Sequence, residues 1–187
     1  MTTSKAKKAL FLDRDGVINI NHGYISDTKD FIFIPEIFQL IRDANNLDYL
    51  VFVITNQSGI GRGFFTEEDF KSLSSWMLNK LSEKGANIQK IYFSPFHPTN
   101  GEGKYLKDDF SRKPNPGMII DAAKEFNLDL EQSLLVGDSI SDIIAGNRAR
   151  IKTNLYFSDK PISSSIISDE VNFFRIACLS EASKFLS

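Results

Sequence analysis

The sequence has few cysteines and little net charge. Cys178 is the single cysteine among 187 residues, so no disulfide can form within the chain. Its apolar neighbours predict a buried thiol. A single unpaired cysteine also fits a protein from a reducing compartment. The formal charge is only -2 at pH 7 and no long basic run occurs. This balance argues against nucleic acid as the main partner.

Long hydrophobic runs are also missing. No apolar stretch approaches the roughly 20 residues that a membrane-spanning helix needs. The first apolar run, residues 9–12, is too short for a signal-peptide core and meets a charge at Asp13. We therefore expect a cytoplasmic protein without a membrane partner. A length of 187 residues lies near the upper end of the common single-domain range, so residues 1–187 are predicted to form one domain. We also expect a monomer.

Short apolar runs alternate with helical patterns along the chain. Strands are expected at residues 9–12, 49–54, 88–93, 133–136, 153–157 and 171–176. Helices are expected at 35–47, 66–84, 116–126 and 140–148, and a short one at the end of the chain; Thr66 should cap the second. This alternation predicts an α/β fold, a three-layer, Rossmann-like and mostly parallel sheet with helices on both faces. The spacing leaves room for loops but for no sizeable cap domain.

Polar segments follow the first two predicted strands. In parallel sheets, ligands bind beyond the carboxyl ends of the strands, so these segments are candidates for a site. Asp13-Arg14-Asp15-Gly16 places two carboxylates where they can converge on one cation. Thr55-Asn56-Gln57-Ser58-Gly59 offers a hydroxyl and backbone N–H groups that suit a phosphate. Taken singly, each segment could also be an ordinary polar turn.

Two later segments add cations and further acids. Arg112-Lys113-Pro114 precedes a predicted helix, and Gly137-Asp138-Ser139-Ile140-Ser141-Asp142 follows a predicted strand. A solvated Arg-Lys pair and a helix cap are the simpler interpretations of each one alone. Together, the four segments supply what aspartyl-phosphate chemistry requires. These are a carboxylate nucleophile, a second acid, cations for the phosphoryl oxygens and oxygen ligands for a hard metal ion.

The four segments resemble the motifs of the haloacid dehalogenase-like (HAD-like) phosphatases. More narrowly, they are similar to the branch of the heptose-bisphosphate and histidinol-phosphate phosphatases. The resemblance implies that Asp13 is the nucleophile and Asp15 the general acid/base. It implies that Thr55 and Lys113 hold the transferring phosphoryl group. It further implies a Mg²⁺ ion bound by Asp13, Asp138 and the backbone carbonyl of Asp15.

The same resemblance suggests where the substrate lies. We expect a small phosphorylated metabolite as the partner, in particular a sugar bisphosphate such as D-glycero-D-manno-heptose 1,7-bisphosphate. Histidinol phosphate or another small phosphomonoester remains an alternative substrate. A metabolite-binding protein that has lost catalysis remains an alternative function. The expected contacts are with the sugar and with a second phosphate, and comprise His22, Tyr24, Asn56, Gln57, Arg62 and Arg112.

One feature departs from the branch. Relatives commonly carry a zinc loop with a Cys-x-His pair and a Cys-x-Cys pair, whereas the matching positions here are Ser94, Phe96, Asp109 and Ser111. Without thiolates, a tetrahedral structural zinc is not expected. His97 is then predicted to be an ordinary loop histidine. Burial of aromatic side chains should hold the loop instead, and the candidates are Phe93, Phe96, Tyr105 and Phe110.

Overall fold

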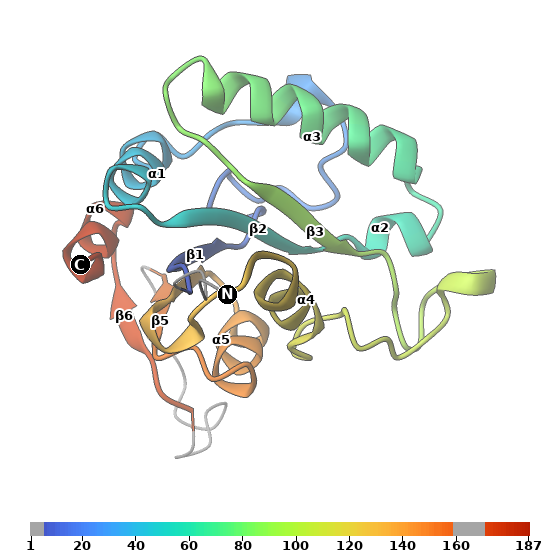
Figure 1. The fold of residues 1–187 in the computed structure, drawn as a ribbon. Coiled ribbons are helices and arrows are strands. Elements are labelled where there is room, and N and C mark those ends of the chain that lie inside the picture. Colours follow the sequence, from blue (N-terminus) through green and yellow to red (C-terminus); the bar gives the residue numbers. More distant parts are fainter. Residues whose placement is uncertain (1–5, 159–170) are drawn as a thin grey trace.

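A parallel sheet forms the centre of the molecule. The computed structural model describes residues 6–158 and 171–187, in which six strands lie in the order β3-β2-β1-β4-β5-β6 (Figure 1). Every neighbouring pair of these strands is parallel. The strands are β1 (Ala9–Leu12), β2 (Leu50–Asn56), β3 (Lys90–Ser94), β4 (Leu134–Gly137), β5 (Thr153–Phe157) and β6 (Phe174–Ile176). The predicted strands are thus confirmed, with shifts of one to three residues at some ends.

Side chains of the strands alternate between two hydrophobic clusters, one on each face of the sheet. Leu10 and Leu12 of β1 belong to the cluster covered by α1 (Ile37–Asn46), α3 (Glu67–Ser82) and α6 (Leu179–Ala182). Phe11 belongs to the opposite cluster, below α4 (Gly117–Phe126) and α5 (Ile140–Arg148), where its ring stacks on Phe52 at 5.5 Å. Figure 1 shows the two helical layers on either side of the sheet. The predicted three-layer α/β architecture is therefore confirmed.

Local signals in the sequence explain most helix boundaries but not all. Helix α3 begins with the predicted cap, since Thr66 Oγ1 accepts from Asp69 N at 3.1 Å and Asp69 Oδ2 accepts from Thr66 N at 2.8 Å. The prediction missed α2 (Ser58–Gly61), a single turn that contains two glycines, because glycine is a poor helix former. It also missed the short 3₁₀ turns η1 (Thr28–Asp30), η2 (Gly103–Tyr105), η3 (Leu130–Gln132) and η4 (Ser183–Phe185).

The strand order creates a place for a ligand between β1 and β4. From β1 the chain proceeds to β2 and β3 on one side, and then returns to β4 on the other side of β1. The connections at the carboxyl ends of β1 and β4 therefore diverge and leave a crevice. Between β1 and α1 the chain contains only loops and η1, so no sizeable cap domain covers this crevice from that segment.

Two other findings concern the ends and surface of the chain. Cys178 was predicted to be buried, which is wrong, because it is partly exposed and its Sγ lies 3.0 Å from Ser180 Oγ. It precedes the short helix α6, where the buried positions are Leu179 and Ala182. Within the described residues, no helix combines the length and the apolar character needed to span a membrane.

Candidate active site

A cavity of about 420 Å³ lies at the carboxyl ends of the strands. Eight residues predicted from the sequence line it together, although they come from five separate segments of the chain. These are Asp13, Asp15, Tyr24, Thr55, Asn56, Gln57, Lys113 and Asp138. The order of the motifs along the sequence thus becomes one site in space.

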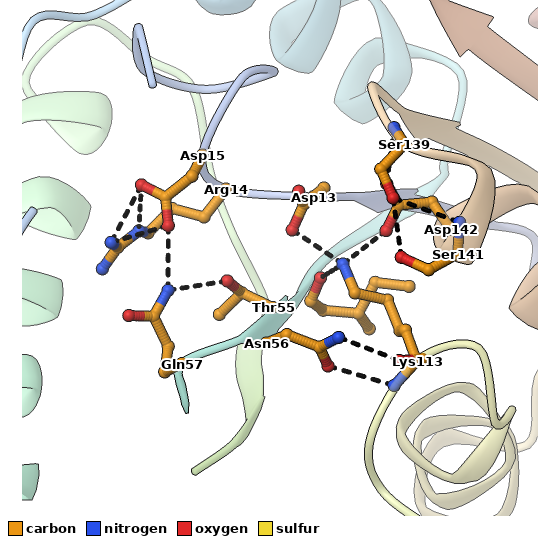
Figure 2. A network of polar contacts seen from close by, with 11 residues as sticks. Asp13, Arg14, Asp15, Thr55, Asn56, Gln57, Lys113, Ser139, Ser141 and Asp142 are labelled. Atoms are coloured by element: carbon orange, nitrogen blue, oxygen red, sulfur yellow. Dashed lines mark hydrogen bonds and ion pairs between the residues drawn. The ribbon is translucent and has the colours of Figure 1, made fainter. Parts of the chain in front are cut away.

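Lys113 is the cation at the bottom of this site. Its Nζ donates to Asp13 Oδ1 and to the Ile54 carbonyl, both at 2.8 Å, and lies 2.5 Å from Asp142 Oδ1 (Figure 2). The side chain is only 3% exposed, and an unpaired ammonium so deeply buried would be very unfavourable. Burial lowers the pKa of Lys113, but the charges of Asp13 and Asp142 outweigh it and raise the pKa overall. Lys113 therefore remains a cation beside Asp13.

Three carboxylates crowd around this lysine. One oxygen from each of Asp13, Asp138 and Asp142 lies within 4.8 Å of the others. Burial raises the pKa of Asp13, and its acidic neighbours add to that effect. Burial and the charge of Asp142 likewise raise the pKa of Asp138, to about 6. Such a concentration of negative charge and hard oxygen ligands fits a Mg²⁺ ion, which would relieve the repulsion between the carboxylates.

Gly16 leaves room for this acidic cluster. Its φ of +101° is a conformation that side-chain-bearing residues rarely adopt. In addition, a Cβ at this position would overlap the carboxylate of Asp138. The glycine after the acid pair is therefore required both by the turn and by the neighbouring motif.

Asp15 is held by a dense set of donors. Its Oδ1 accepts from Arg14 Nε at 3.1 Å and from Asn19 Nδ2 at 3.0 Å, while its Oδ2 accepts from Arg14 Nη2 at 2.8 Å and from Gln57 Nε2 at 2.9 Å. Arg14 itself is 1% exposed. Our sequence analysis gave Arg14 no role, although an arginine two residues after a buried strand needs a charged partner, which the adjacent Asp15 supplies.

The amides of Asn56 and Gln57 have protein partners. Asn56 accepts from the backbone N of Lys113 and donates to its carbonyl, both at 3.0 Å. Gln57 Nε2 donates to Asp15 and, at 2.8 Å, to Thr55 Oγ1. Both residues line the cavity, but their polar groups are directed to other residues of the site (Figure 2).

Asp142 belongs to the site as well, although our sequence analysis gave it no role of its own within its segment. Its Oδ2 accepts from the backbone N of Ser139 at 3.0 Å, and this contact is part of a capping box at the start of α5. The pattern Ser139-x-x-Asp142 carries that signal. A capping role hides the second one, because the other carboxylate oxygen contacts Lys113.

The remaining predicted contacts lie outside the cavity lining. His22 is exposed. Arg62 places its guanidinium carbon 5.8 Å from the centre of the Tyr24 ring, which also packs edge-on against Phe64. Arg112 Nη1 donates to the Phe96 carbonyl at 2.9 Å. Burial, and then the charge of Arg62, lower the pKa of Arg112.

Comparison with known proteins identifies the family. Residues 110–165 match the HAD-hydrolase-like family model. The chain is 50% identical to the D-glycero-alpha-D-manno-heptose-1,7-bisphosphate 7-phosphatase of Burkholderia mallei, over 83% of this chain and 82% of the relative. The chain belongs to the HAD-like phosphatases. The resemblance predicted from the motifs is confirmed, and the protein is a phosphoric monoester hydrolase.

Two further HAD-like phosphatases support this assignment. The D-glycero-beta-D-manno-heptose-1,7-bisphosphate 7-phosphatase of Pasteurella multocida is 44% identical over 84% of this chain and 85% of the relative. A crystal structure of the D,D-heptose 1,7-bisphosphate phosphatase from B. bronchiseptica, complexed with magnesium and phosphate, has a TM-score of 0.77 and 25% sequence identity. The match covers 95% of this chain and 96% of the B. bronchiseptica chain.

The loop at residues 94–111, where no structural zinc is expected, is tied by polar groups. Ser111 Oγ lies 2.7 Å from Asp109 Oδ1 and 3.0 Å from Ser94 Oγ. Tyr105 donates to Glu67 at 2.7 Å and packs near Phe96, with 6.1 Å between the ring centres. The prediction that Phe110 is buried is wrong: it is 60% exposed.

The loop predictions for Phe93 and His97 can also be compared with the structure. Phe93 packs against Phe70, with 4.5 Å between the ring centres. The Nδ1 atom of His97 accepts from the backbone N of Asn100 at 3.0 Å. His97 thus has ordinary loop contacts, as predicted.

Proposed function

We propose that this HAD-like phosphatase releases the 7-phosphate of D-glycero-D-manno-heptose 1,7-bisphosphate through a covalent aspartyl-phosphate on Asp13. The observation that carries the proposal is the contact of Asp13 with Lys113 on the floor of the cavity, beside Asp138 and Asp142. The two relatives are named for this substrate, which favours it over histidinol phosphate.

The first half of the reaction transfers the phosphoryl group to the protein. A carboxylate oxygen of Asp13 attacks phosphorus while the bond from phosphorus to the sugar oxygen breaks. Asp15 donates a proton to that leaving oxygen. Lys113 and Thr55, which flank Asp13 in the cavity, stabilise the charge on the phosphoryl oxygens.

The second half returns the protein to its starting state. A water molecule attacks the phosphorus of the aspartyl-phosphate, and Asp15 accepts its proton. The bond to Asp13 breaks and inorganic phosphate leaves. Asp13, Asp138 and the Asp15 carbonyl would hold Mg²⁺, with Asp142 nearby. When bound, this ion neutralises charge on the phosphoryl group.

The second phosphate of the substrate is assigned to Arg62 and Arg112. The charge of Arg62 lowers the pKa of Arg112, and a phosphate bound by both guanidinium groups would relieve that repulsion. Tyr24 lines the cavity on the side of Arg62 and is assigned to the sugar, together with the exposed His22. Asn56 and Gln57, in contrast, act through neighbouring residues.

Three further properties belong to the proposal. The loop at residues 94–111 holds no structural zinc, because Ser94, Phe96, Asp109 and Ser111 supply no nitrogen or sulfur ligand. The hydroxyls of the two serines and the Asp109 carboxylate instead bind one another. The protein acts as a monomer in the cytoplasm, without nucleic acid or membrane partners.

A panel of substrates tests the proposed function. Phosphate release with Mg²⁺ should be compared for both anomers of the heptose 1,7-bisphosphate, the heptose 1-phosphate, histidinol phosphate and p-nitrophenyl phosphate. We expect the highest kcat/KM for one bisphosphate anomer, with one phosphate released per sugar. A preference for histidinol phosphate, or equal rates on all compounds, would contradict the substrate assignment.

A further inference from the structure

Gln57 lies between two residues that have roles in the proposed function. The side chain is buried, with 3% exposed. A single nitrogen, Nε2, donates to Asp15 Oδ2 at 2.9 Å and to Thr55 Oγ1 at 2.8 Å (Figure 2). Its two N–H groups are therefore both used, one on each neighbour. Neither contact was expected from the sequence, which assigned Gln57 to the substrate.

The carboxylate of Asp15 determines which way this amide points. Both oxygens of Asp15 accept hydrogen bonds in this structure, as they do in the ionised form that takes the proton from water in the second half of the reaction. In that form a flipped amide would place the Gln57 oxygen against another acceptor. Arg14 and Asn19 hold the Asp15 carboxylate from its other sides. The orientation of the Gln57 side chain is thus fixed by a charge that is itself held in place.

The amide in turn determines the direction of the Thr55 hydroxyl. A hydroxyl has one proton to donate, and the Thr55 oxygen already accepts from Gln57. Within residues 6–158 and 171–187, this is the one hydrogen bond recorded for the Thr55 hydroxyl. Thr55 lines the cavity, so its proton is available to an acceptor there, such as a phosphoryl oxygen.

We propose that Gln57 is a positioning residue that fixes Thr55 as a hydrogen-bond donor to the phosphoryl group. The inference rests on the proposed function. It adds to it a chain of hydrogen bonds in which Asp15 orients the Gln57 amide and the amide orients the Thr55 hydroxyl. Without Gln57, the hydroxyl could rotate and donate to protein acceptors, and part of its stabilisation of the transition state would be lost.

A double-mutant cycle tests this inference. Gln57→Met keeps the approximate volume but removes the amide, and should lower kcat roughly tenfold, or about 1.4 kcal/mol, with little change in KM. In a Thr55→Val background, Gln57→Met should change kcat less than about twofold, since the hydroxyl to be oriented is gone. In a Thr55→Ser background, which retains the hydroxyl, the tenfold loss should return.

Two results would overturn the inference. One is a Gln57→Met enzyme with the kcat of the wild type. The other is an equal loss of kcat in the wild-type and Thr55→Val backgrounds, which would show that Gln57 does not act through the hydroxyl. If Gln57→Met does not fold, Gln57→Asn replaces it, because its shorter side chain cannot reach both neighbours.

The proposed function has its own controls in the same experiment. An active wild type and an inactive Asp13→Asn variant would support that function whatever Gln57 does. An active Asp13→Asn variant would instead contradict the function. The two failures are therefore distinguishable.

Discussion

Asn56 should matter for activity far more than its contribution to stability suggests. Its amide forms two hydrogen bonds with the backbone of Lys113, both at 3.0 Å. Asn45 forms the same pair with the backbone of Asn87, at 3.1 and 2.9 Å. The first pair lies in the active site and the second on the surface of the molecule, so the chain provides its own matched control.

The expected effects of Asn56→Ala and Asn45→Ala follow from these contacts. Each loses two hydrogen bonds at about 0.5–1.5 kcal/mol apiece, so each should lower the free energy of unfolding by about 1–3 kcal/mol. The hydrogen bonds of Asn45 are exposed to solvent, so Asn45→Ala should lie at the lower end of that range. Asn56→Ala should also release the backbone that holds Lys113 against Asp13, and a displacement of about 1 Å can lower turnover on the order of 100-fold. Asn45→Ala should leave turnover unchanged.

Urea unfolding and phosphate release measure the two quantities separately. The reasoning predicts similar losses of stability and very different losses of kcat/KM. If Asn56→Ala were as active as Asn45→Ala at equal stability, then the two hydrogen bonds of Asn56 would not position Lys113.

Three other predictions concern the metal ions, the loop and the pH dependence of folding. Removal of divalent ions with EDTA should abolish phosphate release and added Mg²⁺ should restore it, whereas full activity after exhaustive chelation would contradict the metal assignment. Elemental analysis should find no stoichiometric zinc, and one tightly bound zinc ion per chain would contradict this. Phe96→Ala should raise KM clearly and lower Tm only slightly, because it loosens the loop and not the common core. An unchanged KM with a large fall in Tm would contradict that role of Phe96. Hydrogen bonds from Thr66 N and Oγ1 lower the pKa of Asp69, so its carboxylate stabilises the fold above about pH 3.9, and that contribution is lost as the pH falls through the lowered pKa. Asp69→Asn should therefore be less stable than the wild type in urea unfolding at pH 7, and a difference that did not shrink at low pH would contradict this origin.

The sequence predicts the sheet and the main motifs because their signals are local. The run at residues 9–12 and the β-branched run at 49–54 are each apolar throughout, which is typical of strands covered on both faces. The polar residues after such strands must lie at one edge of the sheet. Asp13 and Lys113 therefore could be placed together although 100 positions separate them along the chain.

Partners within the site could not be predicted in the same way. The amide of Gln57 can bind a substrate or a neighbouring residue equally well, and only the positions of Asp15 and Thr55 decide between them. Phe110 is apolar but exposed, because burial depends on what covers a loop. Asp142 carries a cap signal and an ion pair at once, and the sequence reveals the first more readily.

The central claim, that Asp13 is the nucleophile of a phosphatase, has one direct test. Turnover of D-glycero-D-manno-heptose 1,7-bisphosphate with saturating Mg²⁺ should be measured for the wild type and for Asp13→Asn, with Tm confirming that the variant is folded. We predict release of the 7-phosphate by the wild type and a loss of at least roughly 1,000-fold in the variant, or about 4 kcal/mol in the barrier. A folded Asp13→Asn enzyme with turnover near that of the wild type would contradict the claim.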